Sequence, residues 1–491
     1  MKTSNMKYAV VLLLVISSSL LSKNKSESYG VGFNFYQVYD TTQLYVYNQD
    51  TIFRPLLIHL WYPTEVKTDN DQMSYKQYID LISIREDFSK PKEETDTESL
   101  NFINAYSGFA KKQYGIGLNL SAEQILATPV KARLKSPIAK GNFPLIIYAP
   151  SNSKTSEQNH IICESLASSG FVVLSVASAG QNSINREDTK SSILAQVNDM
   201  EYILNYLENT LKIQYSNIGL MGFSSGGLAT SIFQMKHENV KAVFGLDGGH
   251  EYSTYLFLHQ LKDYDLSKTT VPYCFMANKN LDFSIYPYFN SIKTNKKWFF
   301  RMPYLTHNDF ASYWAFFDSC NKDSVQNNIS ISYKYISDYA VTFFDATLNN
   351  NLNSKNTLDS LSSLKNEFVI PEKVDYSKAT NLLNTYLGSN IDSAISIYKK
   401  DKSKKESAYN YSESEINILG KMLYDKYLDD SIKLFYFNTE EYPNSWLTHF
   451  YLGYAYKAKG NLGLAKISLL KAQELNPEEE ETKKLLSELE K

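Results

Sequence analysis

The chain has 491 residues, of which 43% are hydrophobic and 21% are charged, and 50 basic against 53 acidic residues give a formal net charge of -3. This composition is that of a globular protein and excludes wholesale disorder, collagen and a bundle of membrane helices. The balanced charge gives no basic field for nucleic acid, and the three cysteines are too few for a disulfide framework.

Residues 1–22 have the pattern of a secretory signal peptide. Lys2 and Lys7 precede a short apolar run from Tyr8 to Ile16, and small residues follow it. This run is shorter than the ~20 apolar residues that a membrane span needs. We therefore expect a secreted, periplasmic protein that has no integral membrane span after removal of the signal.

From about residue 56 the chain alternates short apolar runs with helical stretches. Strands are expected at Leu56–Trp61, Leu145–Ala149, Val172–Val176, Ile218–Met221, Ala242–Leu246, Tyr273–Met276 and Lys297–Arg301. Continuous apolar strands separated by helices predict a mostly parallel sheet with helices on both faces. We assign this α/β domain to residues 30–352, with a polar insertion at about 66–140 that would help to build a substrate pocket.

A stretch rich in Asn, Ser and Lys at 353–375 is interpreted as a linker, and residues 376–491 beyond it are predicted to be all helical. Three segments of this region align with starts 37 and 34 residues apart: Ala394–Tyr398, Ser431–Phe435 and Ala465–Leu469. The spacing and the small residues between large ones resemble the tetratricopeptide repeat, in which paired helices stack. We predict two clear repeats, one degenerate repeat and a capping helix, which together would contact a protein partner or pack against the α/β domain.

The run Gly222-Phe223-Ser224-Ser225-Gly226 stands between a predicted strand and a predicted helix. This is the G-x-S-x-G pattern of a nucleophile elbow in the strand-turn-helix context that it requires. The glycines allow a tight turn with close backbone approach, and the helix N-terminus favours a developing alkoxide. Ser224 is therefore the candidate nucleophile.

A nucleophilic serine of this kind needs a base and an orienting acid, in the chain order Ser, Asp or Glu, His. His307 follows the last predicted strand and is the candidate base. Two acids remain open from the residues alone: Asp247 ends one strand and precedes a Gly-Gly pair, and Asp282 follows the next strand.

From about Arg54 to Asn349 the chain resembles the platelet-activating factor acetylhydrolase branch of the α/β-hydrolases, adjoining the dienelactone hydrolase-like enzymes. The resemblance is carried by six segments: Arg54–Pro63, Phe143–Tyr148, Leu166–Val173, the Ser224 elbow, Leu246–Gly248 and Thr306–Phe310. In that branch the acid stands on the strand after the nucleophile's helix, which favours Asp247 over Asp282. The helical tail is similar to the tetratricopeptide tails of bacterial esterase-like proteins.

The oxyanion hole is expected to take backbone N–H groups from Ser225 and from the loop after strand Leu145–Ala149. Family members carry His-Gly in this loop, whereas this chain has Pro150-Ser151-Asn152-Ser153, so Asn152 would supply the second donor. The sequence thus predicts a serine esterase that acts on a small-molecule ester without metal or organic cofactor. The alternative is an inactive hydrolase-fold protein that serves as a tetratricopeptide adaptor.

Overall fold

The computed structural model describes residues 29–68, 71–114, 120–152, 154–181, 189–261, 264–280, 284–320, 328–364, 366–373, 375, 377–402, 404, 408–409 and 412–489. The expected signal peptide at 1–22 lies outside these residues. The chain divides into two compact units. The α/β unit comprises the chain up to Gly249 together with Asp265–Asn280 and Lys293–Lys373, and the helical unit comprises His250–Tyr264, Leu281–Ile292 and the chain from Val374 onward.

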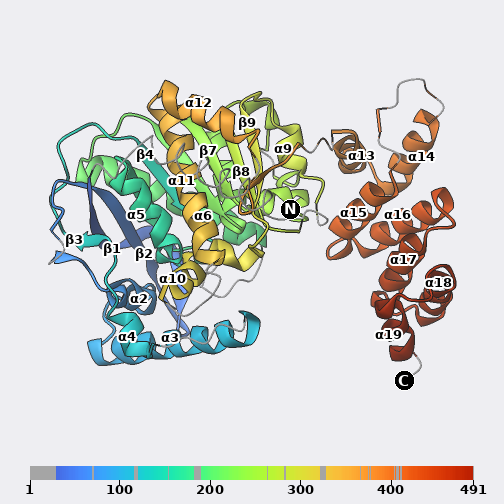
Figure 1. The fold of residues 1–491 in the computed structure, drawn as a ribbon, viewed down its shortest axis with the longest axis horizontal. Coiled ribbons are helices and arrows are strands. Elements are labelled where there is room, and N and C mark those ends of the chain that lie inside the picture. Colours follow the sequence, from blue (N-terminus) through green and yellow to red (C-terminus); the bar gives the residue numbers. More distant parts are fainter. Residues whose placement is uncertain are drawn as a thin grey trace, which may run out of the picture. The chain divides into compact units, whose positions relative to one another are not determined.

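The described part of the α/β unit contains a ten-stranded sheet of order β10-β9-β8-β7-β6-β4-β5-β2-β1-β3 (Figure 1). Its strands are β1 Gly30–Tyr47, β2 Asp50–Thr64, β3 Ala132–Leu134, β4 Leu145–Ala149, β5 Val172–Val176, β6 Ile218–Phe223, β7 Val240–Leu246, β8 Tyr273–Ala277, β9 Lys297–Arg301 and β10 Ile370–Pro371. The strands from β5 to β9 pair in parallel, β2 is antiparallel to β1 and β5, and β10 is antiparallel to β9.

Strands are present at all seven positions predicted from the sequence, and three of them have the predicted ends. Strands β1, β3 and β10 were not predicted. β1 escapes prediction because its polar residues alternate with aromatic ones, and several of its side chains stay exposed. A strand with one solvated face has no continuous apolar run.

Helices cover both faces of the sheet (Figure 1). The helices of this unit are α2 Tyr75–Ser83, α3 Lys92–Tyr114, α4 Ala122–Leu126, α5 His160–Ser168, α6 Thr189–Tyr206, α7 Ser225–Lys236, α10 Ser312–Cys320, α11 Asn328–Leu348 and α12 Leu352–Leu361. Helices α5 and α11 pack on one face, and α6 and α7 pack on the other. This strand order, with its antiparallel second strand and two-sided helical cover, is the α/β-hydrolase fold.

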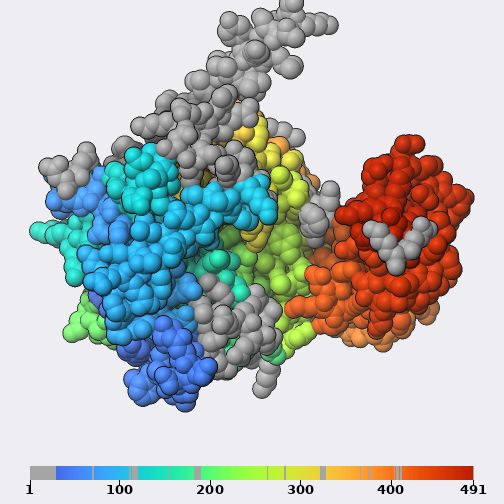
Figure 2. Space-filling view, turned by 90° about the horizontal axis from the view of Figure 1, so that it is seen from below, coloured from blue at the N-terminus to red at the C-terminus, as the bar shows by residue number. Residues whose placement is uncertain are grey.

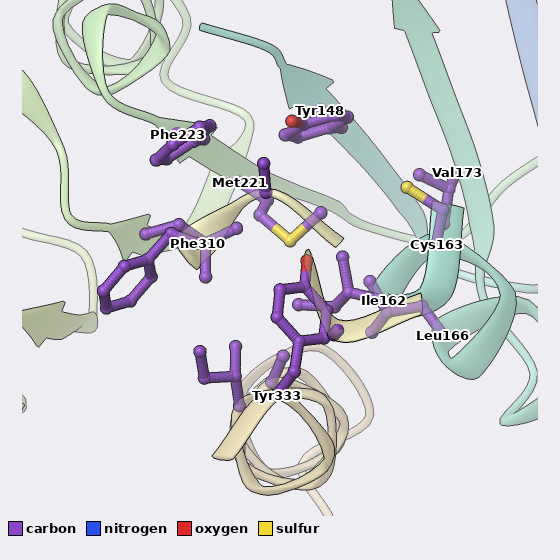
Figure 3. Close-up of a cluster of buried hydrophobic side chains, with 14 of the residues drawn as sticks. Tyr148, Ile162, Cys163, Leu166, Val173, Met221, Phe223, Phe310 and Tyr333 are labelled. Carbon is purple, nitrogen blue, oxygen red and sulfur yellow. The ribbon is translucent and has the colours of Figure 1, made fainter. Parts of the chain in front are cut away.

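The main hydrophobic core lies between the sheet and helices α5 and α11 (Figure 3). Its centre is formed by Tyr148, Val173 and Met221 from the strands, Ile162, Cys163 and Leu166 from α5, and Tyr333 from α11. Burying side chains of this size stabilises the fold by about 1.5–3 kcal/mol each. Cys163 and Cys274 are buried and free, and burial raises the pKa of both thiols well above the ordinary value, so both pack as small apolar side chains.

The predicted insertion at 66–140 folds as α2, α3, α4 and the short edge strand β3. Helix α3 lies along the surface of the α/β unit (Figure 2). The stretch 353–375, expected to be a linker, instead contains most of α12 and the strand β10. Leu358 and Leu361 of α12 are fully buried in the main core, and this stretch belongs to the α/β unit as far as Lys373.

The helical unit is built from paired helices. Its described helices are α8 Tyr255–Leu258, α9 Pro287–Ser291, α13 Ser377–Leu387, α14 Ile391–Asp401, α15 Glu413–Tyr424, α16 Leu428–Glu441, α17 Trp446–Ala458, α18 Leu462–Leu475 and α19 Glu480–Glu488. The three aligned sequence segments lie in α14, α16 and α18. A Cβ on Gly420 would stand 2.3 Å from the Phe435 ring, and one on Gly453 would stand 2.7 Å from Leu469, so glycine sets the spacing of both pairs. Across the described ranges, no helix has both the length and the apolarity to cross a membrane.

Candidate active site

The loop between β6 and α7 is a strained elbow that carries Ser224. Ser224 has φ 54° and ψ -121°, a conformation that is costly for a residue with a side chain. A Cβ on Gly222 would lie 2.6 Å from the carbonyl oxygen of Gly226, and one on Gly226 would lie 2.1 Å from that of Ala149. The glycines of the motif are therefore required by backbone contacts on both sides of the serine.

Three residues predicted from the sequence meet at the carboxyl edge of the sheet. Nε2 of His307 lies 2.9 Å from Oγ of Ser224, and Nδ1 of His307 lies 2.6 Å from Oδ2 of Asp247. Asp247 is completely buried, whereas the His307 side chain is 43% exposed. The arrangement is a hydrogen-bonded Ser-His-Asp chain, and His307 together with Phe223, the residue before Ser224, lines an adjacent cavity.

The position of each partner is fixed by its neighbours. Asp247 accepts hydrogen bonds from the backbone N–H of Asn278 (3.0 Å) and from its side-chain amide (2.9 Å). His307 begins a short 3₁₀ helix at which Asp309 accepts bonds from both the N–H and the hydroxyl of Thr306. These contacts hold the carboxylate and the imidazole in register.

Asp282, the second acid that the sequence left open, lies outside the described residues. Asp247 occupies the position beside Nδ1 of His307. It stands directly after β7, in a turn where its own φ is 45°. Its placement follows from the end of a buried strand and the Gly-Gly pair that comes after it.

Two opposing effects act on the pKa of His307. Burial lowers it, because removal from water disfavours the imidazolium. The hydrogen bond and the negative charge of Asp247 raise it, and the net result is a pKa above the ordinary 6.5. Asp247 thus stabilises the imidazolium form of His307 through its contact with Nδ1, while Nε2 faces Ser224.

The two predicted oxyanion donors lie on segments that touch each other. Ser225 is the first residue of α7, and the next residue, Gly226, packs against the carbonyl groups of Ala149 and Pro150 at the end of β4. Asn152 follows in the same loop. A hydrogen bond from α6 also holds this loop: the side-chain amide of Gln196 donates to the Pro150 carbonyl at 2.8 Å.

A cavity of about 360 Å³ opens beside the triad. Its walls come from α3, the loop after β4, the end of β6, the His307 turn and α10: Ala105, Tyr106, Phe109, Ser151, Lys154, Gln158, Phe223, His307, Asn308, Ala311, Tyr313 and Trp314. The predicted insertion thus contributes to this pocket through α3. The volume falls within the range of small-molecule sites.

Gln196, Asn278 and Lys154 belong to this site but were not predicted. Asn278 carried a usable signal, since it directly follows β8 at the edge where Asp247 lies. Gln196 lies in the middle of a helix, and nothing in its sequence context marks it. Within the described ranges, no group of three or more His, Cys, Asp or Glu side chains is arranged to hold a metal ion.

Comparisons with known proteins add little to this geometry. A ferulic acid esterase from Streptomyces cinnamoneus is similar, with a TM-score of 0.47 and 14% sequence identity, over 70% of this chain and 97% of that chain. No protein-family model and no curated protein matches the sequence. The fold assignment is therefore based on the strand order and the helical cover of this chain.

Proposed function

We propose that this protein is a serine hydrolase that cleaves carboxylic ester bonds through an acyl-enzyme intermediate. The observation that carries the proposal is the continuous contact from Ser224 through His307 to Asp247, at 2.9 Å and 2.6 Å. A serine in a strained elbow, a base within hydrogen-bond distance and a buried acid behind that base are what nucleophilic acyl transfer requires.

The geometry supports a two-stage reaction. With its Nδ1–H donating to Asp247, His307 has Nε2 available to accept the proton of Ser224 as Oγ attacks the ester carbonyl. The same proton then passes to the alcohol as the C–O bond breaks, and the acyl group stays on Oγ. Water next loses a proton to His307 and attacks the acyl carbon, and the acid leaves as Ser224 regains its proton.

The negative oxygen of each tetrahedral intermediate needs preorganised donors. We assign this role to the backbone N–H groups of Ser225 and Asn152, because α7 begins at Ser225 and packs against the loop that contains Asn152. Removal of one such donor typically lowers kcat by ~10²–10³. The anchoring of the Pro150 carbonyl by Gln196 supports the orientation of this loop.

We further propose that the enzyme belongs to the platelet-activating factor acetylhydrolase-like branch and that the helical unit is a tetratricopeptide module that contacts a protein. The close helix approach at Gly420 and Gly453 favours the repeat assignment. Export to the periplasm remains the expectation from residues 1–22.

A fluorophosphonate probe tests the catalytic proposal. Wild type should be labelled, and Ser224→Ala should not. Ser231→Ala is a matched control on the same helix, because among the described residues the Ser231 hydroxyl donates to the carbonyl of Gly227 in its own helix, and it should be labelled normally. An unlabelled wild type, or equal labelling of Ser224→Ala, would instead favour the inactive adaptor.

A further inference from the structure

The cavity beside the triad has a continuous aromatic wall. Tyr106 and Phe109 of α3 meet Trp314 of α10, with ring centroids 5.3 Å and 5.2 Å apart, and Tyr106 also meets Tyr313 at 5.4 Å. Rings that contact one another in this way form a firm apolar surface. Such a wall favours a flat, apolar part of a substrate.

One lysine interrupts this apolar lining. Lys154 is the one Lys, Arg, Asp or Glu among the described residues that line the cavity. Partial desolvation lowers its pKa, the nearby Arg85 lowers it further, and no carboxylate of the described residues counteracts either effect. Lys154 therefore lines the cavity without a neutralising acid among those residues.

The backbone of Lys154 is held in place. Its N–H donates to the carbonyl of Ser151 at 3.1 Å, and its carbonyl accepts from the N–H of Ser178 at 2.8 Å. These bonds fix the residue at the end of the same loop that contains Asn152. The Lys154 side chain is itself exposed, so an anion in the cavity can reach its ammonium group and form a charge-assisted hydrogen bond with it.

We infer that Lys154 is a specificity residue for an ester that carries a carboxylate group on a flat apolar body. The aromatic wall would contact the flat body, and the Lys154 ammonium would pair with the carboxylate while Ser224 attacks the ester. This inference rests on the proposed esterase function and adds the substrate class. The cavity volume of about 360 Å³ accommodates one such body.

Two pairs of esters test the inference, and the members of each pair differ only in the carboxylate. One pair is 4-acetoxybenzoate and its methyl ester, and the other is mono-4-nitrophenyl terephthalate and its methyl ester. Wild type should prefer the anionic member of at least one pair by about tenfold in kcat/KM, mainly through KM. Lys154→Met should lose this preference, Lys154→Arg should keep most of it, and added salt should weaken it.

The neutral esters report on folding and catalysis at the same time, and Lys154→Met should lose much less kcat/KM on them than on the anionic members. Lys241→Met is the control for loss of a positive charge, because Lys241 is exposed near the opposite end of β7. Neutral turnover without an anionic preference, or a preference that survives Lys154→Met, overturns the inference while leaving the esterase proposal intact. Absence of turnover for all four esters, together with an unlabelled Ser224, overturns the esterase proposal itself.

Discussion

Replacement of Glu157 by glutamine should remove a pH-dependent loss of stability in the α/β unit. Glu157 lies in the turn before α5 and is completely buried, with His59 as a buried neighbour whose Nε2 stands 3.7 Å from Oε2. Burial raises the pKa of Glu157 to about 8 and lowers the pKa of His59 to about 3. At neutral pH Glu157 is therefore protonated in the folded protein, whereas in the unfolded chain it is ionised.

The magnitude follows from the two pKa values of Glu157. Between the ordinary value of 4.5 and the folded value of about 8, the folded state binds the extra proton. The free energy of unfolding therefore falls as pH rises, by about 1.4 kcal/mol per pH unit, which amounts to about 3 kcal/mol from pH 4.5 to pH 7. His59 changes the free energy of unfolding in the opposite direction, because the folded protein resists its protonation and so loses stability as pH falls below 6.5. This effect is the same in wild type and in Glu157→Gln.

Urea unfolding followed by tryptophan fluorescence at pH 5, 6 and 7 measures this effect. The free energy of unfolding of Glu157→Gln, relative to wild type, should grow by about 2–3 kcal/mol over that range. Glu65→Gln makes the same charge change at an exposed position and should leave the pH dependence as it is in wild type. Equal pH slopes for Glu157→Gln and wild type would refute the assignment of a protonated Glu157.

Asp247→Asn should lower ester kcat by about 10⁴, and it should move the acid limb of the kcat/KM profile to lower pH, because Asp247 is what raises the His307 pKa. Asn278→Asp should reduce kcat/KM more than Asn278→Ala, since it places a second carboxylate at the 2.9 Å contact with Asp247; equal losses would speak against this contact. Gly226→Ala should abolish ester turnover and lower the melting temperature, because its Cβ would stand 2.1 Å from the Ala149 carbonyl oxygen. Gly463→Ala should be tolerated, because a Cβ at that position has no neighbour within 4 Å. Gly226→Ala with wild-type turnover and melting temperature would contradict the elbow packing.

Features that depend on one short stretch of chain could be predicted from the sequence. β4, β5 and β9 have the predicted ends because each is a compact apolar run bounded by turn residues. Ser224 could be found because a strained elbow demands glycines at fixed offsets, and that demand is visible in the chain. β10 and α12 were missed because their Asn- and Ser-rich surroundings hide the few residues, such as Leu358 and Leu361, that become buried.

Features that depend on distant segments could not be predicted. The residues alone could not choose between Asp247 and Asp282, because both follow strands at the same edge of the sheet. The aromatic wall joins Tyr106 with Trp314, far apart in a chain in which 14% of all residues are aromatic. Gln196 acts through a carbonyl 46 residues away, a contact that exists only once α6 has packed against the sheet.

The helical unit is discontinuous in sequence, and this limits how the protein can be divided. The chain passes between the units after Gly249, Tyr264, Asn280, Ile292 and Lys373. The first passage comes two residues after Asp247, and the third comes two residues after Asn278. A stop codon at 376 would remove the C-terminal helices but leave His250–Tyr264 and Leu281–Ile292, which belong to the same unit as those helices. The first segment follows Asp247 closely in the chain, and the second follows its hydrogen-bond donor Asn278. The α/β unit can therefore be isolated cleanly only if those two segments are redesigned together with the cut.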